Sequence, residues 1–134
     1  MISALKKWTV LLCLLTLTAC VTVTEAPPVM VNGAAGYLEK IALPEGCSIT
    51  IAIIDLDTPG VIVAQKSFNI VRAPVPFKFL LPEESIDDSI HYGVVAMIQF
   101  NNQVIFQTYD RFPVISNDKF TTEVLMKAVP APKS

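Results

Sequence analysis

Cysteine is scarce in this chain of 134 residues, where it occurs only at Cys13, Cys20 and Cys47. Cys13 lies inside an apolar N-terminal stretch, and Cys20 directly follows that stretch. If the stretch is removed and Cys20 is modified, Cys47 stands alone, which excludes an internal disulfide. No basic partner lies near Cys47 in the sequence to activate its thiol, so we expect it to be buried and inert.

Histidine is scarcer still, with His91 as the single example. A catalytic histidine needs a nucleophile and an orienting acid, and a metal site needs further ligands. Asp87 and Asp88 are close in sequence but complete neither set. The motifs CxxC, HExxH and GxSxG and a glycine-rich phosphate loop are also absent. The sequence therefore predicts no catalytic residue, no metal site and no cofactor, and hence a protein that is not an enzyme.

The acidic residues offer only weak alternatives to that interpretation. Asp55 and Asp57 could pair as general acid and base, but they are better explained as the end of a strand entering the turn 57–60. The segment 83–88 lacks the glycine and the alternating ligands of a calcium loop. An envelope enzyme or small-ligand binder that uses His91 or this acidic loop remains an alternative.

Long runs of one charge are missing as well, since no more than two like charges are adjacent. This pattern argues against binding to nucleic acid and against an electrostatic attachment to anionic lipid. Without its first 19 residues the chain has 8 basic and 12 acidic residues, for a formal net charge of −4.

The N-terminus has the layout of a secretory signal peptide. Lys6 and Lys7 precede an apolar run over 10–17, and small residues follow it. The run is about half of the roughly 20 apolar residues that a membrane-spanning helix needs. A cleaved signal peptide over 1–19 is therefore favoured over a retained helix.

The last residues of this segment, Leu17, Thr18, Ala19 and Cys20, resemble a bacterial lipobox. The resemblance implies cleavage before Cys20 and a diacylglyceryl and acyl (palmitate-type) anchor on its thiol and amino group. Two or more acyl chains anchor a protein stably, whereas one does so only marginally. Val21 occupies the position where an aspartate would favour inner-membrane retention. We therefore expect the protein to be anchored at the periplasmic face of the outer membrane of a Gram-negative bacterium.

Removal of the signal peptide leaves 115 residues, enough for one domain and too few for two. Residues 20–32 include Pro27 and Pro28 and read as a lipidated N-terminus and flexible tether. The folded domain is expected over 33–129, and 130–134 is expected to be a disordered tail.

Between tether and tail the pattern is typical of strands. Ile49, Ile51 and Ile53 alternate with smaller residues, the period of a half-buried strand. Asn101 and Asn102 suit a tight hairpin because asparagine tolerates positive φ. Strands are expected over 36–43, 48–56, 61–70, 77–81, 91–100, 103–109 and 120–126. Seven short strands separated by turn signals predict an all-β fold, a seven-stranded immunoglobulin-like antiparallel β-sandwich.

The aromatic residues around the predicted hairpin are the remaining candidates for a site. Phe106, Tyr109 and Phe112 can be core residues of the sandwich, or they can line an exposed groove that accepts a peptide. These three are the candidate partner-binding residues.

The runs GYLEKIALPEGCSITIAIIDLD, VIVAQKSF, PVPFKFLLP and HYGVVAMIQFNNQVIFQTYDRFPVI resemble the YbaY/YscW lipoprotein family over about 36–115. The resemblance implies a lipobox followed by one β-sandwich domain, with no catalytic residues. It also implies a non-enzymatic lipoprotein chaperone that binds an envelope protein.

The two branches of the family imply different clients. The YscW-like branch comprises type III secretion pilotins, which carry a secretin to the outer membrane, whereas the YbaY-like branch has no established activity. The IALPEG and IQFNNQVIFQT stretches fit the YbaY-like side better, and the mature tail lacks the cysteine pair of some pilotins. The sequence therefore favours a chaperone of an envelope protein, with a secretin pilotin as the alternative.

Overall fold

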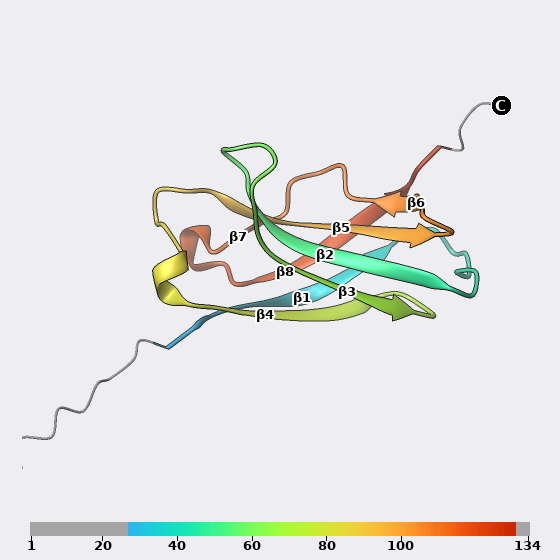
Figure 1. Cartoon of the computed structure of the whole chain (residues 1–134), viewed down its shortest axis with the longest axis horizontal. Helices are drawn as coiled ribbons and strands as arrows, with labels where there is room; N and C mark the ends of the chain where they lie inside the picture. The colour runs from blue at the N-terminus through green and yellow to red at the C-terminus, as the bar shows by residue number, and fades with distance from the viewer. Residues whose placement is uncertain (1–26, 131–134) are drawn as a thin grey trace, which may run out of the picture.

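The computed structural model describes residues 27–130, which form eight β-strands and two short 3₁₀ turns (Figure 1). The elements in chain order are β1 Val29–Tyr37, β2 Cys47–Asp55, β3 Ile62–Ile70, β4 Val75–Leu81, η1 Glu83–Ser85, β5 Tyr92–Phe100, β6 Gln103–Gln107, β7 Pro113–Val114, η2 Ser116–Asp118 and β8 Thr121–Ala128.

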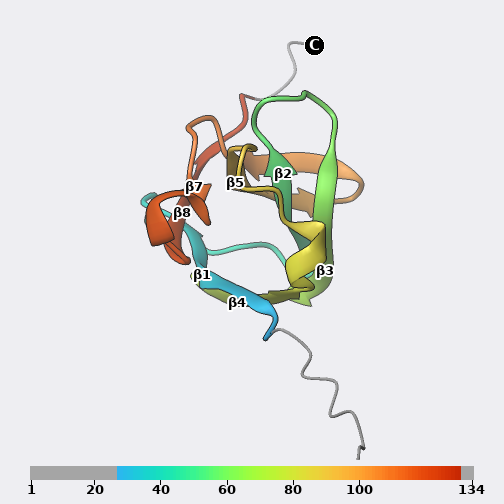
Figure 2. The ribbon, with the colours of Figure 1, turned by 90° about the vertical axis from the view of Figure 1, so that its left-hand side faces the viewer.

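The strands form one curled sheet in the order β3-β2-β5-β6-β8-β1-β4, and β7 pairs with β5. Every neighbouring pair is antiparallel except β1 and β8, which are parallel. Figure 2 looks along the strands and shows them arranged around a central core. The two end strands of the sheet, β3 and β4, come round toward each other, so the sheet is a nearly closed barrel.

The prediction of an all-β fold is confirmed, but the immunoglobulin-like antiparallel sandwich is not the arrangement that forms. The parallel β1–β8 pair joins the two ends of the chain within a single sheet. A period-2 pattern identifies strands and their buried faces, but it carries no information about which strands pair. The number of strands also rises from seven to eight because β7, with two residues, is too short to have a pattern.

The start of the domain differs from the sequence-based expectation. The sequence predicts a tether over 20–32, whereas residues 29–32 belong to β1 and pair with both β4 and β8. The first strand is expected over 36–43, but β1 ends at Tyr37 and residues 38–46 are a loop. Leu38 and Ile41 of that loop are exposed although they are apolar. The alternation of apolar and polar residues over 36–43 therefore does not mark a strand with one buried face. The signal peptide, the lipobox with Cys20 and residues 131–134 lie outside the described residues.

The other strand predictions are confirmed to within a few residues. β2, β3, β4, β5, β6 and β8 lie where the alternating pattern places them. Asn101 and Asn102 have φ of 51° and 63° and connect β5 to β6, as the hairpin prediction requires. The 83–88 segment holds only the short turn η1.

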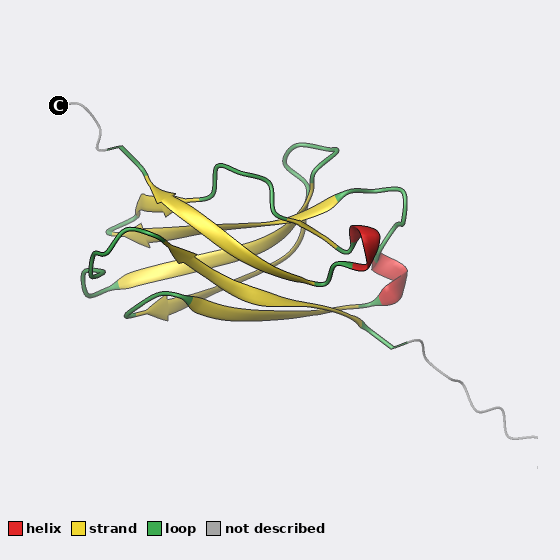
Figure 3. Cartoon of the chain, turned by 180° about the vertical axis from the view of Figure 1, so that it is seen from behind, coloured by secondary structure: helices red, strands yellow, loops and turns green. Residues whose placement is uncertain are grey.

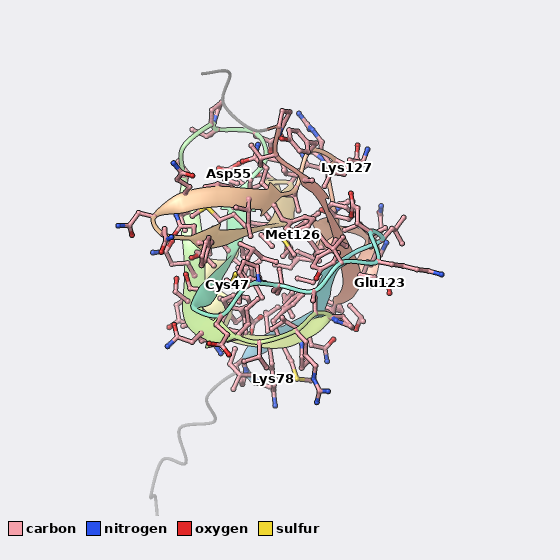
Figure 4. All side chains as sticks on the ribbon, turned by 90° about the vertical axis from the view of Figure 1, so that its right-hand side faces the viewer. Cys47, Asp55, Lys78, Glu123, Met126 and Lys127 are labelled. Carbon is pink, nitrogen blue, oxygen red and sulfur yellow. The ribbon has the colours of Figure 1, made fainter. Side chains whose placement is uncertain are left out.

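The core fills the barrel with side chains from alternate positions of nearly every strand. Ile49, Ile51 and Ile53 of β2 are fully buried, and Phe77 and Phe79 of β4 belong to the same buried cluster. Each such side chain contributes about 1.5–3 kcal/mol when it leaves water. Cys47 is also fully buried, and this burial raises the pKa of its thiol. Figure 4 shows Cys47 inside the ring of strands, so its thiol is shielded from solvent.

The two ends of the barrel are different. The turns η1 and η2 lie together at the end where β1 begins, as the red segments in Figure 3 show. The described chain finishes at the opposite end (Figure 1). Among residues 27–130 there is no helix long and apolar enough to span a membrane.

We expect Gly33→Ala to destabilise the domain more than any other glycine substitution. A Cβ at Gly33 would lie 1.8 Å from the carbonyl oxygen of Thr122 on β8, so β1 and β8 would have to separate. The expected loss is about 3 kcal/mol or more, measured by urea unfolding. Gly60→Ala is the control, because no atom lies within 4 Å of its Cβ position and only its φ of 89° opposes the change. Equal losses in the two variants would contradict this role of Gly33.

Candidate functional site

The three aromatic residues selected from the sequence occupy different environments. Phe106 is only 2% exposed, and its ring stacks on Tyr37 with a centroid separation of 4.3 Å and an interplanar angle of 13°. Phe106 is therefore part of the packing between β1 and β6. Tyr109 is 53% exposed on the segment after β6, and Phe112 is half-buried on the same segment. Of the three, Tyr109 and Phe112 are accessible to a partner.

Phe112 lines a hollow of about 310 Å³ on the outer side of β8. Three segments remote in sequence meet there: the start of the 38–46 loop, the 110–112 segment and the second half of β8. The lining residues are Leu38, Glu39, Asp110, Phe112, Leu125, Met126, Lys127 and Ala128. We call this cavity the Phe112 hollow.

The Phe112 hollow exists because β6 and β8 separate. β6 pairs with β8 through only two residue pairs, Phe106 with Ala128 and Gln107 with Lys127. The chain then leaves the sheet over 109–111 and rejoins the same edge of β5 as β7, with Thr108 and Phe112 hydrogen-bonded to β5 on either side. The first part of β8 therefore lacks a hydrogen-bonded neighbour on that side, and the 108–112 segment arches over the space.

The Phe112 hollow combines an apolar floor with a charged rim. Leu38 is 78% exposed, an unusual position for a leucine, and it stands beside Leu125 and Phe112. At the rim, Lys127 Nζ lies 3.9 Å from Asp110 Oδ2, and both side chains are about two-thirds exposed. Such an exposed pair contributes little to stability and is free to rearrange around a ligand. These groups suit apolar side chains that are flanked by charges.

A second hollow, of about 300 Å³, lies on the outer face of β2 and β5. It forms over the small side chain of Ala52, with Ile54, Val95 and Met97 around it. Thr50 and Ser67 hydroxyls, 2.8 Å apart, are hydrogen-bonded near one end. None of its lining residues is charged, so it offers apolar contact without the orienting groups of the Phe112 hollow.

His91 forms an exposed pair with Asp57. Its Nδ1 lies 3.1 Å from Asp57 Oδ2, and its backbone N–H donates to the same oxygen at 2.9 Å. These hydrogen bonds lower the pKa of the Asp57 carboxyl. Asp55 instead accepts the backbone N–H groups of Asp57 and Thr58, so its carboxylate shapes the turn. Among residues 27–130 no hydrogen bond joins His91 to a serine, threonine or cysteine side chain.

The acidic loop before β5 is organised internally. Asp87 accepts hydrogen bonds from the backbone and hydroxyl of Ser89, which lower the pKa of its carboxyl. Within the described part of the chain, no group of three or more histidine, cysteine or acidic residues could hold a metal ion. Glu83 and Asp88 line a hollow of about 400 Å³ together with Val29, Ile86 and Phe120, so the acidic loop stays an alternative binding site for a small ligand.

Phe106→Ala should destabilise the domain by about 3–5 kcal/mol, because it leaves a cavity opposite Tyr37. Tyr109→Ala should stay within about 0.5 kcal/mol, since its side chain is half exposed. Urea unfolding of both variants separates a packing role from an exposed one. A smaller loss for Phe106→Ala than for Tyr109→Ala would contradict this assignment.

The Asp57–His91 pair makes stability depend on pH. The folded-state pKa of Asp57 lies below its ordinary value of 3.8, so its stabilising contribution is present above that value. The contribution is lost as the pH falls through the folded pKa. Asp57→Asn should therefore lower the melting temperature at about pH 6, by an amount that shrinks as the pH falls below 3.8. A difference that grows toward low pH would have the wrong sign.

Comparison with known proteins places the chain in a family. The profile described as type III secretion system lipoprotein chaperone (YscW) matches residues 26–126. No curated protein sequence matches the chain. Among solved structures, an alternative pilotin from the type II secretion system of Vibrio cholerae is similar, with a TM-score of 0.68 and 27% identity. The match covers 76% of this chain and 97% of the Vibrio chain. This chain belongs to the YscW family of type III secretion system lipoprotein chaperones.

Proposed function

We propose that this protein is a lipid-anchored pilotin whose barrel binds a segment of a secretin subunit and holds it at the outer membrane. The family is one of lipoprotein chaperones, and the similar Vibrio protein is named as a pilotin of a secretion system. Both comparisons support a non-enzymatic chaperone.

The observation that carries the proposal is the Phe112 hollow. It is the described cavity that combines an exposed leucine, a half-buried aromatic ring and a charged pair. Its volume of about 310 Å³ suits one or two leucine-sized side chains of a client segment. Each such side chain contributes about 1.5–3 kcal/mol on burial, which alone gives weak binding.

The lipid anchor would compensate for weak binding. Acylation of Cys20, at the end of the lipobox Leu17-Thr18-Ala19-Cys20, would confine the domain to the membrane and raise the effective concentration of a client there. Six residues lie between Cys20 and Pro27, so the seven Cα-to-Cα steps of the tether span at most about 25 Å. β1 then runs for nine residues, about 30 Å, from the tether to Leu38. The Phe112 hollow would therefore lie at the end of the barrel that is remote from the anchor.

A chaperone of another envelope protein would use the same hollow and anchor. The YbaY-like stretches described above, and the lone Cys47, favour this second possibility. Photocrosslinking from position 109, next to the Phe112 hollow, identifies the client in the native envelope. Capture of a secretin supports the pilotin, and capture of a different envelope protein supports the general chaperone.

Leu38→Asp should reduce client capture at least tenfold, because a carboxylate would have to be buried against Phe112 and Leu125. Val61→Asp is the matched control, since Val61 is also an exposed apolar residue but lies outside the Phe112 hollow. Both variants should keep the unfolding free energy within about 0.5 kcal/mol. Unchanged capture by Leu38→Asp would remove the Phe112 hollow as the binding site.

Cys20→Ser should separate anchoring from binding. We expect the purified variant to bind the client as the wild type does, while the client no longer reaches the outer membrane in cells. Membrane fractionation and secretin-multimer blots measure this outcome. Normal outer-membrane assembly with Cys20→Ser would contradict the role of the anchor.

A further inference from the structure

The barrel has a seam between β3 and β4, the two strands at the ends of the sheet order. β3 pairs only with β2, and β4 pairs only with β1. Among residues 27–130, no backbone hydrogen bond joins β3 to β4. Figure 2 shows these strands meeting at one corner of the ring. Two unpaired edges thus face each other, and an edge strand is a template for an additional strand.

One side chain bridges the seam. Lys66 of β3 donates a hydrogen bond from Nζ to the carbonyl oxygen of Lys78 on β4 at 2.6 Å, and Nζ lies 5.3 Å from the centroid of the Phe79 ring. No carboxylate of the described residues pairs with Lys66. A lysine on an edge discourages indiscriminate strand pairing. Lys66 thus donates to the carbonyl oxygen of Lys78, which could instead accept a hydrogen bond from the N–H of an added peptide strand.

The edge of β4 has a defined set of free groups. The carbonyl of Lys78 faces the seam, and the N–H and C=O of one residue point to the same side of a strand. Lys78 and Leu80 therefore present both groups to the seam, while Pro76 presents only its carbonyl. The intervening residues Phe77 and Phe79 point their backbone groups toward β1.

The seam is also basic in an acidic protein. Residues 61–81 contain Lys66, Arg72 and Lys78 and no acidic residue, whereas the rest of 27–130 has four basic and eleven acidic residues. Leu80 is 58% exposed, and Phe68 of β3 is 38% exposed. The seam therefore offers positive charge, free backbone groups and apolar side chains together.

We propose that the β3–β4 seam is a second binding surface that accepts an extended acidic segment of a partner protein as an added strand along β4. The backbone of the added segment would form hydrogen bonds to the backbone of Lys78 and Leu80, displacing the Lys66 side chain. The carboxylates of the segment would pair with Lys66, Lys78 and Arg72. This surface is separate from the Phe112 hollow. Figure 4 shows Lys78 and Lys127, one from each site, on opposite sides of the barrel.

The test uses full-length protein purified from membranes in detergent and a fluorescein-labelled octapeptide that alternates valine with aspartate or glutamate. Anisotropy should show binding that weakens at least tenfold when lysines replace the acidic residues. It should also weaken at least tenfold when alternate backbone nitrogens are methylated, because methylation removes the N–H donors without changing charge. Binding that survives methylation would overturn strand addition.

Variants locate the peptide on the barrel. Lys66→Glu combined with Lys78→Glu should weaken binding at least tenfold, whereas Lys40→Glu combined with Lys119→Glu, outside both the seam and the Phe112 hollow, should change it less than twofold. Leu80→Pro removes an N–H that faces the seam and is not used by β1, so it should also abolish binding. If this variant fails to fold, the methylated peptide still tests the backbone contact.

Two outcomes would overturn the proposal. Equal effects of the two charge-reversed double variants would show nonspecific attraction between opposite charges. Dimerisation of the wild type in sedimentation experiments, blocked by Leu80→Pro and without peptide binding, would assign the seam to a second copy of the chain. Leu38→Asp should leave peptide binding unchanged, so failure at the seam is independent of the Phe112 hollow.

Discussion

The double pairing of β1 is the constraint on which the barrel depends. β1 pairs antiparallel with β4 and parallel with β8, so it joins the last strand of the chain to the middle of the chain. The close approach of Gly33 to Thr122 makes this possible, because a side chain at position 33 would occupy the space of the Thr122 carbonyl. Without β1, β4 and β8 would have no connection within the sheet, and the core would open on one side.

Incomplete closure of the barrel produces both candidate binding surfaces. β6 leaves β8 after two residue pairs, which opens the Phe112 hollow, and β3 does not pair with β4, which leaves the basic seam. The strands around these gaps still share one apolar core, so the openings cost little packing. A chaperone needs surfaces that a client can complete. A barrel with two incomplete contacts supplies them while its interior stays packed.

Local patterns in the sequence were sufficient for most strands and for the hairpin at Asn101 and Asn102, because burial on alternate faces and positive φ are properties of a few adjacent residues. The parallel β1–β8 pair could not be predicted, since it depends on residues about 90 positions apart. The candidate site was predictable only in part. Aromatic clustering in the sequence points to Phe112. The alternating pattern places Leu38 in a strand, whereas its exposure in a loop follows from where β1 ends.

The direction of β1 has a mechanical consequence. Its first residue follows the proposed tether, and its last residue adjoins Leu38 of the Phe112 hollow. Tension between an anchored lipid and a bound client would therefore run along β1. The hydrogen bonds to β4 and β8 lie across that direction and would be loaded together, in shear, rather than one after another. The strand that joins β4 to β8 would thus also bear the load of a client in the proposed function.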